Sequence, residues 1–281
     1  MSMGRKKTFV VGWPIAHSRS PLIHGYWLDK YRIDGSYEKL AVAPEHFADL
    51  LPSLLAKGYR GGNITLPHKI SALNSVDECS PLAQIIGAVN TVSFRDGRIY
   101  GSNTDAYGFF KNLTDCAPDW RPKNGPALVL GAGGAALAVI AALLQEGVPR
   151  IVLANRSRHK AEAIQKRFGN RIEIIDWDER RRPLPDSALL VNTTSLGMTG
   201  KPALHMDISG LSRGALVSDL VYAPLQTPLL EAAAAGGFAV ADGLGMLLHQ
   251  AAPGFEQWFG VMPEVTPELR ALVERDLKEN P

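Results

Sequence analysis

The segment Gly-Asn-Ile-Thr-Leu-Pro-His-Lys at residues 62–69 places a positive charge where an expected strand passes into an expected helix. Pro67 is typical of a first helical turn, because a proline lacks the N–H that would be unpaired there. Lys69 would then lie at the positive end of the helix dipole, which disfavours a cation by roughly 0.3–1 kcal/mol. Its position alone leaves two interpretations open: a solvated lysine whose long stem swings clear of the helix, or a lysine placed for proton transfer.

Two hydroxyl groups lie in an earlier turn of the chain. Residues 8–13 indicate a buried strand ended by Pro14, and Ser18 and Ser20 follow it. Ser20 before Pro21 is a good helix N-cap, which would explain Ser20 but leaves Ser18 unexplained. The alternative is that both hydroxyls reach one ligand at the mouth between strand and helix.

The elements between these two segments indicate how they are positioned. Strands are expected at 36–42 and 58–64, with a helix at 44–57 between them. The βαβαβ order favours a mostly parallel sheet, with ligands past the carboxyl ends of its strands. The serine turn lies at one such end and the Lys69 segment at another, and this convergence favours a chemical role for Lys69.

A hairpin is expected next, because Asp96-Gly97 separates two short apolar strands. The hairpin brings Asn90-Thr91 near Asn103-Thr104-Asp105, and the latter opens a helix. On its own, Asp105 is explained as an acid that is favourable to the helix dipole.

The second half of the chain begins a new pattern after a polar, proline-rich link at 117–126. An apolar strand from Ala127 runs into Gly131-Ala132-Gly133-Gly134-Ala135-Ala136 and an alanine-rich helix. This is a G-x-G-x-x-A fingerprint in its strand–turn–helix setting, and the N–H groups of such a helix terminus bind a pyrophosphate. The sequence therefore predicts a dinucleotide site in a second domain.

The following strand, at 150–154, ends in Asn155-Arg156-Ser157-Arg158. An NAD site would place an acidic residue here for the ribose 2′-hydroxyl, whereas a guanidinium group suits a 2′-phosphate. The pattern favours NADP over NAD. The alternative is that these arginines only cover the surface of a helix.

Composition excludes several other classes of function. The 30 lysines and arginines nearly balance 28 acidic residues, so no basic field favours nucleic acid or a membrane surface. No apolar run approaches the roughly 18 residues of a membrane span. Cys79 and Cys116 fit no zinc or redox spacing and, without a signal peptide, indicate reduced thiols in the cytoplasm. The seven histidines show no ligand spacing, and no metal site is expected.

These patterns predict an α/β chain of two domains. The first is a mostly parallel-sheet substrate domain at 1–104, completed by C-terminal helices at 243–281, and the second is a Rossmann-type NADP domain at 105–242. The active site is expected in the cleft between them. A homodimer is compatible with the sequence, which does not fix the oligomeric state.

Several motifs in register over essentially the whole chain resemble the shikimate dehydrogenases. They are residues 14–21, 63–69, 87–91, 101–108, the glycine turn, 155–157 and 243–250. The resemblance implies reversible reduction of 3-dehydroshikimate to shikimate by NADPH. This is an oxidoreductase reaction at a CH–OH group, in the pathway to chorismate and the aromatic amino acids.

The resemblance also implies roles for individual residues. Lys69 and Asp105 correspond to the catalytic pair, with Lys69 as general acid and base. The implied substrate contacts are Ser18, Ser20, Asn63, Thr65, Asn90, Tyr222 and Gln250. The implied cofactor contacts are Gly131, Ala132, Gly133, Gly134, Ala135, Asn155, Arg156, Ser157, Arg158, Lys160, Thr193, Leu220, Gly243 and Met246.

Three positions, Trp13, Gly62 and Leu137, depart from the family's pattern. Leu137 stands where an arginine is common, so NADP binding would depend more on Arg156 and Arg158. Serine at both positions of the serine turn favours shikimate over quinate, by analogy. Two alternatives are a quinate/shikimate dehydrogenase that uses NAD, and a catalytically silent NADP-binding sensor, which would need a broken catalytic pair.

Overall fold

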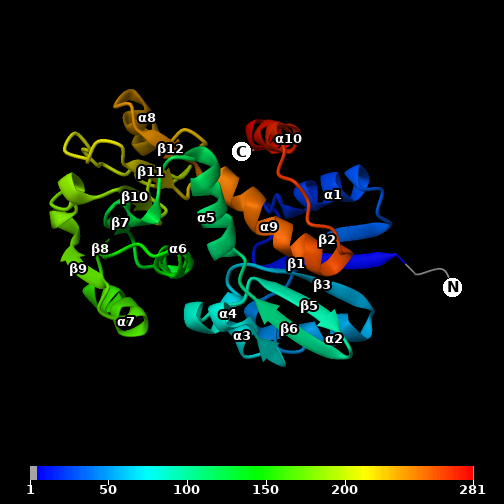
Figure 1. Ribbon diagram of the computed structural model, residues 1–281. Coiled ribbons are helices and arrows are strands. Elements are labelled where there is room, and N and C mark those ends of the chain that lie inside the picture. The colour runs from blue at the N-terminus through cyan, green and yellow to red at the C-terminus, as the bar shows by residue number, and fades with distance from the viewer. Residues whose placement is uncertain (1–4, 281) are drawn as a thin grey trace. The chain divides into compact units, whose positions relative to one another are not determined.

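The computed structural model describes residues 5–280, and the chain divides into two units. Unit 1 comprises the chain through Thr104 together with the chain from Gln250 onward, and unit 2 comprises Asp105–His249. Figure 1 shows the elements in their order along the chain. Residues 243–249 fall in unit 2, whereas the sequence placed all of 243–281 with the first domain.

Unit 1 is built on a six-stranded sheet. Its strands are β1 (Lys6–Gly12), β2 (Gly35–Ala41), β3 (Tyr59–Ile64), β4 (Glu78–Cys79), β5 (Thr91–Arg95) and β6 (Arg98–Ser102). Its helices are α1 (Ser20–Lys30), α2 (Leu50–Ala56), α3 (Lys69–Leu73), α4 (Pro81–Ile86), α10 (Pro267–Glu279) and the part of α9 (Gly243–Phe259) that follows His249.

The sheet of unit 1 is mixed, with strand order β2-β1-β3-β5-β6-β4. β1 pairs in parallel with β2 and β3, β4 pairs in parallel with β6, and β5 is antiparallel to both of its neighbours. The expected hairpin is confirmed, because β5 and β6 are joined at Asp96 and Gly97, which have φ of 52° and 72°. Positive φ at both central residues is what a two-residue type I′ turn requires.

Three local expectations for unit 1 are wrong. The expected helix at 44–57 forms only a 3₁₀ turn at Pro44–His46 before α2 begins at Leu50, because the chain turns there to bury Phe47. Pro67 precedes α3 after a cis peptide bond, and α3 begins at Lys69 itself. Ser20 is the first residue of α1 rather than its cap, since Arg19 occupies the cap position without a side-chain hydrogen bond.

Two hydrophobic layers cover the two faces of this sheet. Alternate residues of a strand point to opposite faces, so Phe9 and Val11 of β1 share one face. They pack in a core with Phe47, Leu51 and Ile64. The second layer is an aromatic cluster of His24, Trp27, Tyr37, Phe255 and Trp258, contributed by α1, β2 and α9.

His24 is fully buried in the aromatic cluster. Its ring stacks on Tyr37, with centroids 4.0 Å apart and planes at 9°, and also stacks on Phe255 at 5.9 Å. Burial lowers the pKa of His24 from 6.5 to about 3. The imidazole is therefore neutral at pH 7 and packs as an aromatic ring.

Unit 2 has the second six-stranded sheet. Its strands are β7 (Ala127–Leu130), β8 (Ile151–Asn155), β9 (Ile172–Asp176), β10 (Leu189–Asn192), β11 (Leu216–Asp219) and β12 (Ala239–Ala241). Its helices are α5 (Asp105–Cys116), α6 (Gly134–Gln145), α7 (Arg158–Phe168), α8 (Pro228–Ala235) and the first turns of α9.

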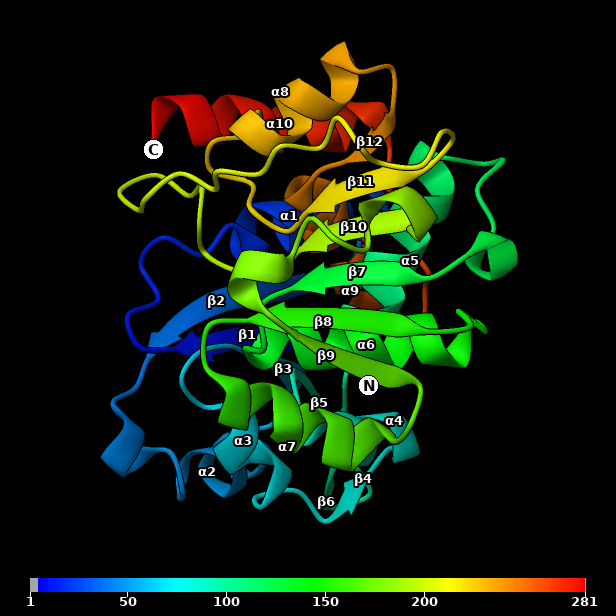
Figure 2. The ribbon, with the colours of Figure 1, turned by 90° about the vertical axis from the view of Figure 1, so that its left-hand side faces the viewer.

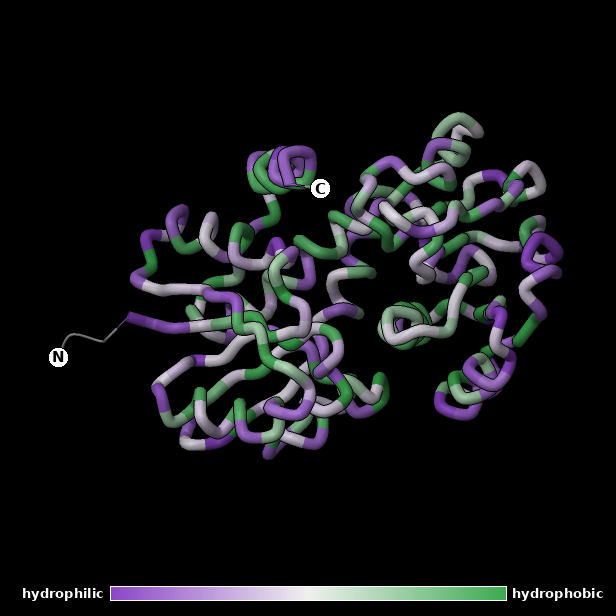
Figure 3. Tube along the Cα trace, turned by 180° about the vertical axis from the view of Figure 1, so that it is seen from behind, coloured by the Kyte–Doolittle hydropathy of each residue, from purple (hydrophilic) through white to green (hydrophobic). Residues whose placement is uncertain are grey.

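The sheet of unit 2 is parallel throughout, in the order β12-β11-β10-β7-β8-β9 seen in Figure 2. This is the arrangement of a doubly wound Rossmann-type sheet, in which the chain reverses its direction of progress beside the first strand. The expected α/β fold class is confirmed. Figure 3 shows α6 mostly in the colour of hydrophobic residues and α7 as largely hydrophilic, in agreement with the buried residues of the two helices.

Among residues 5–280, no helix is both long enough and apolar enough to cross a lipid bilayer.

The neutral state of buried His24 generates a pH prediction. An unfolded histidine gains a proton as the pH falls below about 6.5, whereas folded His24 gains one only near pH 3. The unfolded state therefore binds more protons between these values, and stability falls as the pH falls. We expect His24 to cost the wild type about 2 kcal/mol of unfolding free energy between pH 7 and pH 5.

His24→Phe keeps a stacked ring and removes the titrating group. Denaturant unfolding of wild type and variant at pH 7 and pH 5 measures the difference, and we expect the variant to lose less stability than the wild type by about that amount. Equal losses in the two proteins would contradict the neutral state of His24.

Candidate active site

Four chain segments with polar residues meet at one edge of the unit 1 sheet. β1 and β3 are parallel, so Gly12 and Ile64 end at the same edge. β5 is antiparallel to β3, with Asn63 opposite Thr91, so β5 begins at that edge. β6 is antiparallel to β5, so Ser102 ends there. The register thus brings together the serine turn, the Lys69 segment and the two Asn-Thr segments, as the sequence predicted.

The Asn90 side chain ties the start of β5 to the end of β6. Its Oδ1 accepts hydrogen bonds from the backbone N–H of Thr104 at 2.8 Å and from the Thr91 hydroxyl at 2.9 Å. Its Nδ2 donates to the Thr104 hydroxyl at 3.0 Å. The Asn103 amide donates to the Ala88 carbonyl at 3.0 Å in the same way. These bonds fix the residue directly before Asp105, which opens α5 as predicted.

Asn63 extends this network to the neighbouring strands. Its Nδ2 donates to the backbone carbonyl of Asn90 at 3.2 Å and to the Thr91 hydroxyl at 3.0 Å. Its Oδ1 accepts a hydrogen bond from the hydroxyl of Tyr37 on β2 at 2.6 Å. The buried amide of Asn63 is therefore held in one orientation by hydrogen bonds to β2 and to the start of β5.

The loop between β3 and α3 is anchored on both sides of Lys69. His68 is buried, its ring stacks on Phe47 at 4.5 Å and 8°, and its Nε2 hydrogen-bonds the Val42 carbonyl at 2.8 Å. The carbonyl of Lys69 accepts a hydrogen bond from the N–H of Val89 at 2.9 Å. Lys69 and Thr65 are half-buried, so their side chains combine a fixed backbone with access to solvent.

The serine turn lies beside the same edge. Ser20 is buried and Ser18 is half-buried. The Oγ of Ser18 accepts a 3.4 Å hydrogen bond from the N–H of Ser20, so Ser18, rather than Ser20, pairs with a backbone group at the start of α1. Because Ser20 does not cap the helix, capping no longer explains its presence.

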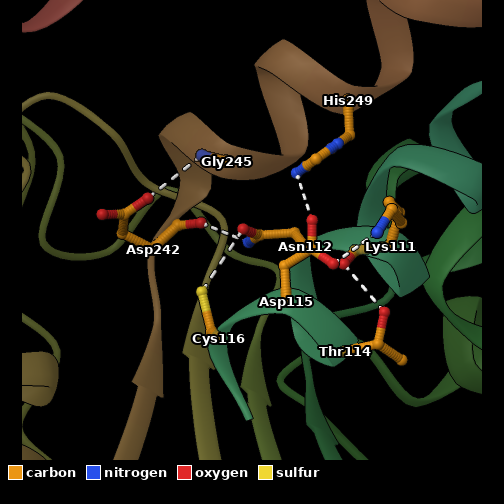
Figure 4. A network of polar contacts seen from close by, with 8 residues as sticks. All are labelled: Lys111, Asn112, Thr114, Asp115, Cys116, Asp242, Gly245 and His249. Atoms are coloured by element: carbon orange, nitrogen blue, oxygen red, sulfur yellow. Dashed lines mark hydrogen bonds and ion pairs between the residues drawn. The ribbon is translucent and has the colours of Figure 1, made fainter. Parts of the chain in front are cut away.

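In unit 2, a polar network joins α5, which begins at Asp105, to the first turns of α9 (Figure 4). Asn112 donates to the carbonyl of Asp242 at 2.8 Å, and the Asp242 carboxylate accepts from the N–H of Gly245 at 3.1 Å. A Cβ at Gly245 would lie 1.7 Å from Oδ1 of Asn112, so only glycine allows this close approach. The network fixes the start of α9, which carries Gly243 and Met246.

A second polar cluster continues this contact along the two helices (Figure 4). The Asp115 carboxylate lies 3.2 Å from His249 Nε2 and forms an ion pair with Lys111. The pKa of His249 is lowered, because burial outweighs the raising effect of Asp115 and Lys111 lowers it further. His249 directly precedes Gln250, so the cluster also fixes the turn of α9 from which Gln250 extends.

The glycine turn after β7 has the features of a phosphate site. Gly131 has φ of 103°, and a Cβ there would lie 2.8 Å from the Thr193 hydroxyl oxygen. Cβ atoms at Gly133 and Gly134 would meet nothing within 4 Å, so the N-terminus of α6 is open to a ligand. The backbone N–H of Ala132 already donates to Asn155 Oδ1 at 3.1 Å, so Ala132 offers no free N–H there.

The two candidate arginines that follow β8 differ in their contacts. Arg158 pairs with Glu162 at 3.2 Å and with Asp176 at 3.4 Å. Arg156 is exposed and forms no ion pair with any residue in the described part of the chain. Its guanidinium is thus the one better placed to meet a 2′-phosphate, and Lys160 is exposed on the next turn.

The remaining candidate residues fall in both units. Thr193 is buried and donates to the carbonyl of Leu130 at 2.7 Å, beside the glycine turn. Gly243 lies against Leu220, since a Cβ at Gly243 would be 2.1 Å from the Leu220 carbonyl oxygen. Tyr222 in unit 2 and Gln250 in unit 1 are both half-buried. Among residues 5–280, no group of three histidine, cysteine or acidic side chains could hold a metal ion.

Sequence reasoning missed two residues of this site, Tyr37 and His24. Each reaches the Asn63 network through packing between elements that are distant in sequence. The signal that could have found Tyr37 is its position in β2, beside the strand that leads to the serine turn.

Comparisons with known proteins agree with this geometry. A model for the shikimate dehydrogenase substrate binding domain matches residues 10–92. Models for shikimate / quinate 5-dehydrogenase and for the shikimate 5'-dehydrogenase C-terminal domain match residues 119–198 and 243–272. The chain is 53% identical over 279 residues to a protein of Methylocella silvestris named shikimate dehydrogenase (NADP(+)), with 99% of each chain covered.

Solved structures show the same similarity. Shikimate 5-dehydrogenase from Thermus thermophilus, in complex with NADP(H) and shikimate, has a TM-score of 0.84 at 37% identity and covers 98% of this chain and 99% of its own. Quinate dehydrogenase from Corynebacterium glutamicum, in complex with NAD, has a TM-score of 0.88 at 29% identity and covers 95% of this chain and 98% of its own.

Proposed function

The chain belongs to the shikimate dehydrogenase family, and from this premise we propose that it reduces 3-dehydroshikimate reversibly to shikimate with NADPH. The family resemblance of the sequence motifs is confirmed. The observation that carries the proposed activity is the 53% identity, over 99% of both chains, to an NADP-dependent shikimate dehydrogenase. The reaction belongs to the pathway to chorismate and the aromatic amino acids. We propose a cytoplasmic location, because the two cysteines are free thiols.

The proposed cofactor site fits NADP on the residues that are present. The open N-terminus of α6 offers backbone N–H groups to the pyrophosphate, and Arg156 offers an exposed guanidinium to the 2′-phosphate. NADPH, when bound, supplies the hydride. Arg158 is engaged with two carboxylates, which leaves Arg156 the larger share of 2′-phosphate recognition.

In the proposed substrate site, hydroxyl and amide groups recognise a polyhydroxylated carboxylate. The residues proposed to contact it are Ser18, Ser20, Asn63, Thr65, Asn90, Tyr222 and Gln250. Hydrogen bonds within the protein already fix the Asn63 and Asn90 amides. Binding a ligand therefore costs little side-chain conformational entropy at these two residues.

Lys69 is the proposed general acid. Addition of hydride to the carbonyl carbon of 3-dehydroshikimate leaves a developing alkoxide, and the Lys69 ammonium donates the proton that makes it a hydroxyl. A positioned acid contributes typically about 10²–10⁴-fold to the rate. Asp105 is proposed to hold the ammonium in place. Two adjacent residues support this pairing. The N–H of Val89 donates to the Lys69 carbonyl, and Oδ1 of Asn90 accepts from the N–H of Thr104, the residue before Asp105.

Assembly as a homodimer stays a prediction. The NAD-dependent alternative has less support, since no acidic residue stands at positions 155–158, where NAD recognition would require one.

Lys69→Ala tests the general acid. We expect kcat to fall by roughly 10²–10⁴-fold with little change in the KM for shikimate, because the proton is needed chiefly in the transition state. Steady-state kinetics in both directions measure this, with Lys57→Ala as a control that removes an exposed lysine of the same unit. A Lys69→Ala enzyme with near wild-type kcat would refute the role.

Arg156→Ala tests 2′-phosphate recognition. We expect the KM for NADPH to rise at least tenfold, about the effect of losing one charge-assisted hydrogen bond, while the KM for NADH changes little. Arg150→Ala is the matched control, because Arg150 is an exposed arginine at the opposite end of β8, paired with Glu173. If Arg156→Ala raises both KM values equally, its guanidinium does not recognise the 2′-phosphate.

A further inference from the structure

The hydroxyl of Tyr37 contacts a residue of the proposed substrate site. It donates a 2.6 Å hydrogen bond to Oδ1 of Asn63. Burial raises the pKa of Tyr37 well above its usual value. The phenol is therefore protonated at every physiological pH and can act as the donor to Asn63.

The hydrogen bonds of Asn63 leave one position for a ligand. An amide side chain has two N–H donors and an oxygen with two lone pairs. Both donors are used, toward the Asn90 carbonyl and the Thr91 hydroxyl, and one lone pair is used by Tyr37. Asn63 can then offer a ligand only its second lone pair, so it accepts a hydrogen bond from a hydroxyl group and cannot donate to a carboxylate.

The ring of Tyr37 is held in place by the aromatic cluster. It stacks on His24 at 4.0 Å and lies 6.0 Å from the Trp258 ring. Neither ring nitrogen of His24 has a hydrogen-bond partner in the described part of the chain, so His24 contributes a stacking surface rather than a polar contact. The stack fixes the plane of the phenol and thereby the direction of its hydroxyl.

We propose that Tyr37 is a positioning residue for substrate recognition: its hydroxyl fixes the Asn63 amide as an acceptor for a substrate hydroxyl. The inference rests on the proposed function, because it takes Asn63 as a substrate contact. Tyr37 acts through Asn63 and takes no part in proton or hydride transfer.

Tyr37→Phe removes the hydroxyl and keeps the stacked ring. We expect a two- to tenfold rise in the KM for shikimate, about the effect of one lost neutral hydrogen bond. The kcat and the KM for NADP should stay within twofold of wild type. Tyr59→Phe is the matched control, because Tyr59 lies on β3 of the same sheet and its hydroxyl hydrogen-bonds the exposed Glu38 at 2.8 Å. This control should leave both KM values unchanged.

A double-mutant cycle with Asn63→Ala separates positioning from general support of the fold. If Tyr37 acts through Asn63, Tyr37→Phe raises the KM for shikimate by a smaller factor in the Asn63→Ala background than it does in the wild type. Full additivity of the two changes would overturn the proposal. So would an unchanged KM for shikimate in Tyr37→Phe, or equal rises in the KM for shikimate and NADP.

The wild-type enzyme is assayed alongside the variants, so that a failure of the inference can be told apart from a failure of the proposed function. A wild type inactive on shikimate would overturn the function and the inference together. An active wild type, combined with a Tyr37→Phe variant of unchanged KM, would overturn the inference alone.

Discussion

The rule that a buried polar group must have a hydrogen-bond partner governs the candidate substrate site. Asn63, Asn90, Thr91 and Thr104 are all buried at the edge where β3, β5 and β6 meet. An unpaired buried amide would cost roughly 1–3 kcal/mol, so the four side chains pair with one another and with the backbone. The same bonds that remove this cost orient the amides, and they fix the residue that precedes Asp105.

A buried polar group is also paired at the carboxyl edge of the unit 2 sheet. Asp219 is buried at the end of β11 and accepts hydrogen bonds from Asn192, Val221 and Thr227. Burial raises the pKa of Asp219, and these three donors oppose that rise. They hold the ends of β10 and β11 and the start of α8, while the glycine turn beside them keeps an open helix N-terminus. Polar groups at the strand ends of both units thus hold the ends of neighbouring strands together.

Local signals in the sequence predicted much of this arrangement. The glycine turn, the Asp96-Gly97 hairpin and the apolar strands follow from backbone preferences of a few adjacent residues, and the structure confirms them. Other features depend on tertiary packing. Phe47 is buried against His68, and α2 begins only at Leu50 rather than at residue 44. Ser20 is the first residue of α1 rather than its cap. Tyr37 and His24 were missed because no local pattern shows that strand β2 and helix α1 meet at Asn63.

The most direct test of the central claim, that the protein reduces 3-dehydroshikimate with NADPH, is an NADPH oxidation assay on the purified wild type. Initial rates with 3-dehydroshikimate are compared with those for 3-dehydroquinate, and the better substrate is repeated with NADH. We predict rapid oxidation of NADPH that depends on 3-dehydroshikimate, with a far lower kcat/KM for 3-dehydroquinate and for NADH. A higher kcat/KM for 3-dehydroquinate or NADH, or no oxidation with 3-dehydroshikimate, would contradict it.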